Sequence, residues 1–316
     1  MELRFRESET KTTTMKKIVA ILFITLLISC GDKKEDNGKL QVATTTTMIT
    51  DLVKNIGGDL IEVNGLMGSG VDPHLYKASE GDVGKLTNAD VIFYNGLHLE
   101  GKLVDVFEKM ESRGKAAYAV GESLDKSTLI GSDYFASNYD PHIWFDLYYW
   151  AQITNYVTDK LAEQDPENAS AFKANRDAYL KQLSDLNAEL SATISQLPKE
   201  QRILVTAHDA FNYFGRSFDF EVVGLQGLST ATEAGVQDVQ RLTKFIIDNK
   251  IKAVFVESSV PRRTVEALQA AVKAQDHEVK IGGELFSDAL GSAGTVEGTY
   301  VGMYRHNVNT IVNALK

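Results

Sequence analysis

The tripeptide Asp-Pro-His occurs twice in the chain, at 72–74 and at 140–142. The sequence holds only five prolines and six histidines, so this repeat uses two of each. Proline fixes its own φ and restricts the residue before it, which leaves the following histidine little conformational freedom. A stiff loop of this kind suits an imidazole that must point at a metal ion, although Asp-Pro is also ordinary turn chemistry.

Two more side chains extend this pattern. His208 ends the apolar run "RILVTAH", and Asp288 follows "KIGGELFS", so both stand at the ends of predicted strands. Taken singly, a histidine at a strand end more often forms a cap or a hydrogen bond, and Asp288 would suit a turn or a helix N-cap. Together with the two Asp-Pro-His histidines they offer nitrogen and oxygen donors to a divalent ion. The remaining histidines, His98, His277 and His306, better fit packing, loop and helix positions.

The elements that would position these side chains alternate between strand and helix. Such alternation predicts parallel sheets covered on both faces, in which the loops after the strands converge at one edge. His74 follows a predicted strand, and His142 directly precedes the aromatic helix start "IWFDLYYW". The predicted strands cover 40–47, 61–67, 91–96, 116–120, 202–208, 220–226, 252–259 and 279–286, and a last helix covers 296–315.

One long amphipathic helix separates the two series of strands. Over 166–198 the apolar residues recur at steps of three and four, no glycine or proline interrupts them, and prolines mark both ends. A helix of about 30 residues is roughly 45 Å long. A coiled coil is the alternative, but about four heptads within an α/β chain favour a connector. We therefore predict an N-terminal α/β lobe at 40–165, a connecting helix at 166–198 and a C-terminal α/β lobe at 199–316.

The N-terminus has the pattern of a secretory signal. Lys16 and Lys17 precede an apolar run that is too short to span a bilayer and that ends at "LISC". This pattern resembles a bacterial lipobox, so we predict a signal peptide at 1–29, lipidation of Cys30 and a polar tether at 30–39. A buried cysteine after an ordinary apolar stretch is the alternative. Residues 1–14 are polar and carry no targeting pattern, which favours Met15 as the start.

Charge and cysteine content narrow the possible functions. The formal net charge of −10 argues against nucleic acid as a partner, because phosphate binding needs a basic face. Cys30 is the only cysteine. Its acylation would leave no thiolate ligand and no disulfide, so a metal site would have to use His, Asp or Glu.

Four long motifs resemble the solute-binding lipoproteins of zinc/manganese ABC importers, the cluster A-I or cluster 9 family, and in particular its TroA-like receptors. The similarity runs in order from about residue 40 to the C-terminus and includes the connecting helix. The motifs are "VDPHLYKASEGDVGKLTNADVIFYNGLHLEG", "DPHIWFD", "TAHDAFNYFGRSFDFEVVGLQGLSTATEAG" and "GGELFSDALGSAGTVEGTYVGMYRHNV".

This resemblance implies two α/β lobes with parallel sheets, joined by one long rigid helix, with a single divalent ion in the cleft between them. The ligands it implies are His74 and His142 from the N-terminal lobe and His208 and Asp288 from the C-terminal lobe. Three imidazoles and a carboxylate suit Zn²⁺, while Mn²⁺ stays open because geometry and availability can override the order of affinities.

The implied function is capture of the ion and its delivery to a membrane permease and its ATPase, not catalysis. Four ligands around the ion leave little room for a reactive water, and no HExxH motif occurs. Glu233 and Glu257 are candidates to orient the ligand imidazoles. We expect an extracytoplasmic, membrane-anchored monomer, from a family whose surface-exposed members are also described as adhesive. A receptor for a metal chelate such as haem or a siderophore, and a metallohydrolase, are the alternatives.

Overall fold

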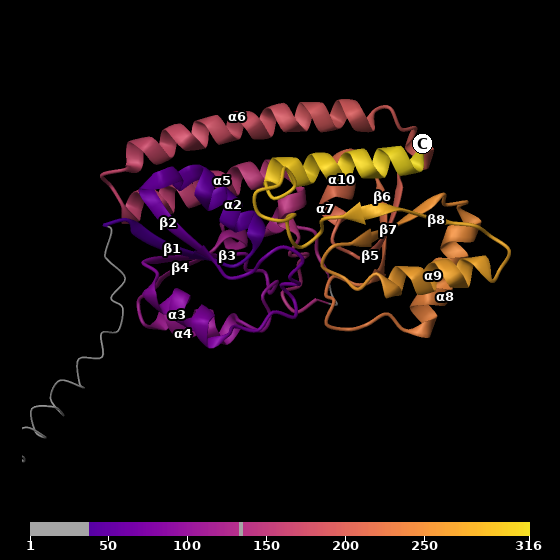
Figure 1. The fold of residues 1–316 in the computed structure, drawn as a ribbon, viewed down its shortest axis with the longest axis horizontal. Helices are drawn as coiled ribbons and strands as arrows, with labels where there is room; N and C mark the ends of the chain where they lie inside the picture. The colour runs from indigo at the N-terminus through magenta and orange to yellow at the C-terminus, as the bar shows by residue number, and fades with distance from the viewer. Residues whose placement is uncertain (1–37, 133–134) are drawn as a thin grey trace, which may run out of the picture. The chain divides into compact units, whose positions relative to one another are not determined.

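The computed structural model describes residues 38–132 and 135–316, and Figure 1 labels their helices and strands. The predicted signal peptide at 1–29 and the predicted lipidation residue Cys30 lie outside the described residues. Within the described ranges, no helix combines the length and the apolar character needed to cross a bilayer.

The N-terminal lobe is built on a four-stranded parallel sheet with the strand order β2-β1-β3-β4. Its helices α2 and α5 lie on one side of the sheet, and α3 and α4 lie on the other (Figure 1). The strands are β1 Leu40–Thr44, β2 Ile61–Gly65, β3 Val91–Tyr94 and β4 Ala116–Ala119, and the helices are α2 Thr47–Gly57, α3 Glu80–Asn88, α4 Val104–Ser112 and α5 Leu147–Gln164.

The strands of this lobe are apolar on both faces, as a sheet between two helical layers requires. Val42 and Phe93 pack into the core beneath α2 and α5, whereas their neighbours Ala43 and Ile92 pack into the core beneath α3 and α4. All four are fully buried. Because side chains alternate between the two faces of a strand, the continuous apolar runs fill both layers.

The C-terminal lobe contains two parallel strand pairs, β5 with β6 and β7 with β8, and β5 lies beside β7. These strands also alternate between two cores, with Leu204 and Phe255 on one side and Val205 and Val256 on the other. The elements are β5 Ile203–His208, α7 Asn212–Phe218, β6 Glu221–Gln226, α8 Val236–Asp248, β7 Ala253–Glu257, α9 Arg263–Lys273, β8 Lys280–Leu285 and α10 Tyr300–Leu315.

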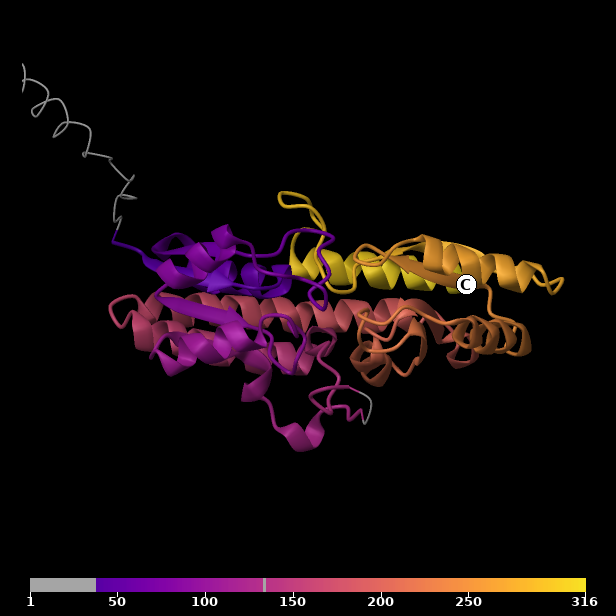
Figure 2. The ribbon, with the colours of Figure 1, turned by 90° about the horizontal axis from the view of Figure 1, so that it is seen from below.

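The connecting helix α6 spans Ala169–Ile194, which is shorter than the predicted 166–198. It packs against α2 and α5 at one end and against α10 at the other, as Figures 1 and 2 show. Its 26 residues correspond to about 39 Å. Beyond Ile194 the hydrogen bonds change to the shorter 3₁₀ spacing, in which the Leu197 N–H donates to the Ile194 carbonyl. The helix therefore ends before Pro198. The buried residues of α6 are Phe172, Tyr179, Leu183, Leu186, Leu190 and Ile194.

The two lobes share one apolar core, and Leu40–Lys316 form a single compact unit. Aromatic residues fill the junction: the rings of Phe145 and Phe211 lie 4.5 Å apart. The hydroxyls of Tyr300 and Tyr304, on α10, donate to the carbonyls of Trp144 and Phe145 at 2.6 and 2.7 Å. The boundaries predicted at 165 and 198 stay predictions, because this core crosses from one lobe to the other.

Candidate metal centre

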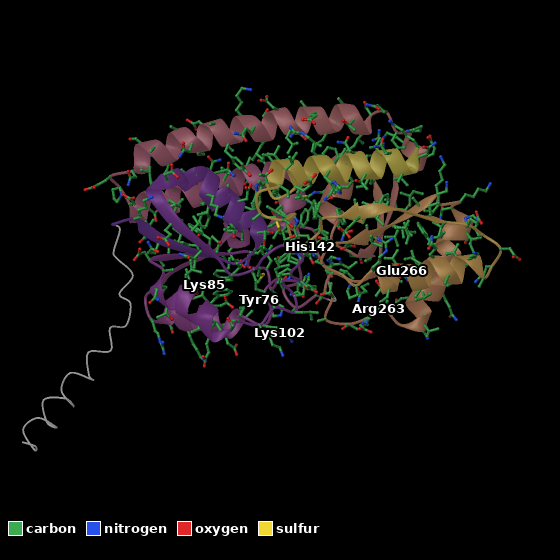
Figure 3. The ribbon with its side chains drawn as sticks, in the orientation of Figure 1. Tyr76, Lys85, Lys102, His142, Arg263 and Glu266 are labelled. Carbon is green, nitrogen blue, oxygen red and sulfur yellow. The ribbon has the colours of Figure 1, made fainter. Side chains whose placement is uncertain are left out.

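The four predicted ligands meet where the two lobes face each other. His74 lies in the loop after β2, and His142 precedes a short 3₁₀ turn that leads into α5. His208 is the last residue of β5, and Asp288 lies three residues beyond the end of β8. One ligand atom from each residue lies within 4.8 Å of all the others. Figure 3 labels His142 at this junction.

Asp140 fixes the orientation of His142. One of its oxygens, Oδ1, accepts from the His142 backbone N–H at 2.9 Å and from Nδ1 of the same ring at 2.7 Å. Because Nδ1 must donate to the carboxylate, the lone pair of the ring is on Nε2, which faces the centre. On the C-terminal-lobe side, the Asn212 amide donates to the other oxygen of Asp140 at 3.0 Å. The proline between aspartate and histidine holds this short turn.

Glu257 has the same relation to His208 in the other lobe. It ends β7, next to the end of β5, and its two oxygens accept from the His208 backbone N–H at 2.9 Å and from Nδ1 at 2.5 Å. In the neutral ring, the lone pair of His208 therefore also lies on Nε2, which faces the centre. Both residues are buried.

The loop that carries His74 is held by Asp72. Oδ1 of Asp72 accepts from the His74 backbone N–H at 2.8 Å, and Oδ2 accepts from the Thr230 hydroxyl of the C-terminal lobe at 2.5 Å. The first Asp-Pro-His motif thus reaches across to the other lobe through its aspartate.

The distances at the centre match the space around one ion. Nε2 of His74 lies 3.3 Å from Nε2 of His142, and the Asp288 carboxylate lies 3.9, 3.6 and 3.2 Å from Nε2 of His74, His142 and His208. Four donors arranged tetrahedrally at about 2.1 Å from a zinc ion would be about 3.4 Å apart. Among the described residues, His208 Nε2 and both oxygens of Asp288 are buried without a hydrogen-bond partner. Buried polar atoms without partners are costly, and a cation would satisfy all of them at once.

The pKa values of two histidines in the centre shift in opposite directions. Burial lowers the pKa of His74 to about 3. Burial also disfavours charge on His208, but the carboxylates of Glu257 and Asp288 outweigh it and raise the pKa of His208 well above its ordinary value. The pKa of Asp288 is lowered, because its attraction to His208 exceeds the effect of burial. An ion must therefore displace a proton from His208, so ion binding should strengthen as pH rises.

The structure places the two predicted orienting glutamates differently. Glu257 contacts His208 directly, as described above. Glu233 is exposed, its carboxylate lies 3.7 Å from the Arg263 guanidinium, and it makes no hydrogen bond to a ligand imidazole within the described ranges. Asp140 was missed as an orienting carboxylate. Its position two residues before a histidine in "DPH" was the available signal, since aspartate often accepts from the backbone N–H two residues on.

In this chain, two α/β lobes enclose a buried polar centre at the carboxyl ends of parallel strands. This arrangement defines the class of two-lobed binding proteins. The family model described as ZnuA, "Zinc-uptake complex component A periplasmic", matches residues 42–314. The chain belongs to this family. The resemblance to metal solute-binding proteins of ABC importers, and the predicted fold class, are confirmed.

Individual relatives are similar over most of the chain. The manganese-binding lipoprotein MntA of Bacillus subtilis (strain 168) is 46% identical over 303 residues, 95% of this chain and 98% of the relative. The zinc-binding protein TroA of Treponema pallidum (strain Nichols) is 50% identical over 279 residues, 88% of this chain and 90% of the relative. The solved structure of periplasmic zinc-binding protein TroA from Treponema pallidum superposes with a TM-score of 0.86 at 50% identity, covering 88% of this chain and 99% of that chain.

Proposed function

We propose that this protein is an extracytoplasmic substrate-binding lipoprotein that captures one divalent transition-metal ion, Zn²⁺ or Mn²⁺, and delivers it to the permease of an ABC importer. The observation that carries the proposal is the set of four buried donor atoms within 4.8 Å of one another. The proposed ligands are His74, His142, His208 and Asp288, with Asp140 and Glu257 orienting two of the imidazoles.

The geometry favours capture over catalysis. The four ligands are at most 4% exposed, so neither a substrate nor a free reactive water has an open position beside the ion. The closeness of the donors also disfavours a receptor for haem or a siderophore, because an organic chelate would have to separate them. A zinc-loaded protein that hydrolyses ester or phosphate substrates would favour the metallohydrolase alternative instead.

The donor set and the relatives leave both metals in the proposal. Three imidazoles and one carboxylate suit zinc, and zinc exceeds manganese in intrinsic affinity at such sites. One relative named for manganese and one named for zinc have similar identity to this chain. We therefore propose zinc binding with manganese as a second cargo.

Anchoring, location and partners complete the proposal. Lipidation of Cys30, supported by the "LISC" pattern and by relatives named lipoproteins, would hold the protein at a membrane outside the cytoplasm. The receiving partners would be a membrane permease and its ATPase. The chain would act as a monomer, with the lobes 40–165 and 199–316 on either side of the connector 166–198.

Elemental analysis of protein purified without added metal, followed by competitive titration with Zn²⁺ and Mn²⁺, tests this function. We expect one ion per chain in the wild type. His208→Ala should weaken binding by more than about 100-fold, beyond the usual effect of an outer contact, and leave the circular dichroism spectrum unchanged. His277→Ala removes an imidazole that precedes β8, at the end of the strand away from Asp288, and serves as the control. Unchanged metal content in His208→Ala would contradict the proposal.

A further inference from the structure

A cavity of about 400 Å³ is lined by residues that adjoin or contact the proposed metal ligands. Two of its lining residues are neighbours of His208: Asp209 follows it in the chain, and Gln226 pairs with it in the β5–β6 register. A third, Phe135, stands edge-on to the His74 ring, with the ring centroids 6.3 Å apart. The cavity is therefore lined by residues of both lobes that neighbour ligands, although none of the four ligands lines it directly.

The four proposed ligands differ slightly in how deeply they are buried. The side chains of His142 and His208 are fully buried and Asp288 is 1% exposed, whereas His74 keeps 4% of its surface exposed. Phe135 packs against His74 and also lines the cavity. Phe135 thus connects the cavity wall to His74, the ligand with the largest exposed fraction.

The cavity wall contains a polar group that lacks a partner. Gln226 is only 6% exposed, and its Nε2 donates to the Thr232 carbonyl at 3.2 Å. Its Oε1 has no hydrogen-bond partner in the part of the chain that the structure describes. Buried polar atoms usually have hydrogen-bond partners, so this oxygen is an acceptor in the cavity wall that still needs a donor.

Charged groups also line the cavity. Asp209, Glu233 and Asp238 contribute carboxylates, and Arg241 contributes one guanidinium. Arg263, labelled in Figure 3, lies 3.7 Å from Glu233 and offsets part of its charge. The segment "STATEAG", which contains Glu233, therefore forms the wall of this cavity instead of touching an imidazole.

We propose that this cavity is the route by which the hydrated metal ion reaches the centre, and that Glu233 at its rim raises the local concentration of the ion. The inference rests on the proposed function, since it needs a metal ion as cargo. Carboxylates at the mouth of a low-dielectric cavity attract cations and speed their association. Rotation of the Gln226 side chain would let its unpartnered oxygen accept a hydrogen bond from water carried by the ion.

Two opposite charge changes at one ion pair separate this role from a structural one. Glu233→Gln and Arg263→Gln both break the same pair of exposed side chains. A structural contribution of the pair would move the association rate constant in the same direction in both variants. Attraction of the ion instead predicts a slower rate for Glu233→Gln and a faster rate for Arg263→Gln.

Stopped-flow mixing of the full-length protein with ZnCl₂ or MnCl₂ measures these rates. Trp144 provides the signal, because its ring lies 5.3 Å from that of His142. At low ionic strength we expect the association rate constant to change about two- to fivefold in opposite directions, and the differences to shrink at high salt. Dissociation rates, measured by displacement into a chelator, should change less. Glu221→Gln, at the start of β6 and therefore at the end of the strand away from Gln226, is the matched control.

Three results would overturn the route. The association rate could stay unchanged in both variants, shift in the same direction in both, or fall equally in Glu221→Gln. These outcomes require a wild type that binds the ion. A wild type that takes up neither metal in the equilibrium titration would refute the proposed function itself.

Discussion

At the scale of single residues, the centre depends on carboxylates that do not face the ion. Asp140 and Glu257 each accept from both the backbone N–H and Nδ1 of the histidine that they hold. Each carboxylate thereby fixes the position of the main chain, the rotation of the ring and the tautomer at once. These hydrogen bonds orient the two imidazoles through atoms other than Nε2.

Glu257→Gln should lower metal affinity by about 10–100-fold. The amide keeps one oxygen acceptor, but its NH₂ group would face a second N–H donor of His208, so one of the two hydrogen bonds is lost. Isothermal titration with Zn²⁺ measures the change. Glu284→Gln, an exposed change on the neighbouring strand β8, should bind zinc like the wild type. Wild-type affinity in Glu257→Gln would show that the contact does not support the ligand.

The sequence indicated the four side chains that the structure brings together, but it gave weaker signals for the groups that support them. Histidines behind Asp-Pro pairs and at strand ends could be found because their local signals are short and rigid. The contact of Asn212 with Asp140 spans 72 residues, and no local pattern indicates it. Glu233 was singled out because a ligating histidine usually donates its other N–H to an acceptor, but its loop lines the neighbouring cavity instead.

At the scale of elements, α2 and α10 meet at a carboxylate outside the centre. Asp51 on α2 accepts from the Tyr300 backbone N–H at the first residue of α10, at 3.1 Å. Burial raises the pKa of Asp51 to about 6, and the hydrogen bond from Tyr300 and the nearby charge of Lys54 only partly oppose this. Tyr179 of α6 lies near the same carboxylate. Charge on Asp51 at neutral pH therefore costs stability.

Asp51→Asn should stabilise the protein above pH 6 and have no such effect below about pH 4. The folded state binds a proton on Asp51 more tightly than the unfolded chain does, so the wild type loses stability as pH rises from 3.8 to about 6. The asparagine keeps an acceptor for Tyr300 and carries no charge, so the gain at pH 7.5 is roughly 1–3 kcal/mol. Urea unfolding across this pH range measures the difference. A gain that does not depend on pH, or one that also occurs in the exposed control Asp59→Asn, would contradict this account.

Most elements of the fold could be predicted from sequence because their patterns are long or strongly apolar. The apolar face of α6 and the bounds of the strands were predicted to within a few residues. The seven-residue helix α7 was missed, since "FNYFGRSF" is too short for a helical period and contains a glycine. Tertiary contacts stabilise this short helix, such as the hydrogen bond from the Tyr213 hydroxyl to the Asp140 carbonyl at 3.0 Å.

At the scale of the whole molecule, the lobes are connected by more than one helix. The core crosses between them, and α7 contributes a further link, in which Arg216 pairs with Asp146 at 2.7 Å. The same guanidinium lies 4.9 Å from the ring centroids of both Tyr149 and Tyr213. Such an interface opposes a wide hinge opening.

Small-angle scattering should therefore show the same radius of gyration with and without zinc, within experimental error. Separation of the lobes would expose the aromatic junction and break its hydrogen bonds, which is too costly for a large population of open molecules. The comparison uses one preparation, before and after removal of the metal by a chelator. A clear compaction on metal addition would contradict this expectation. It would mean that the lobes close widely, as they do in binding proteins whose lobes are joined by two flexible strands.

The central claim is that three nitrogens and one carboxylate from two lobes hold a single ion. Anomalous diffraction at the zinc absorption edge, from crystals grown with Zn²⁺, tests it most directly. We predict one strong peak per chain, about 2.0–2.2 Å from Nε2 of His74, His142 and His208 and from an oxygen of Asp288. A peak at other residues, or no peak between these four side chains, would contradict the account.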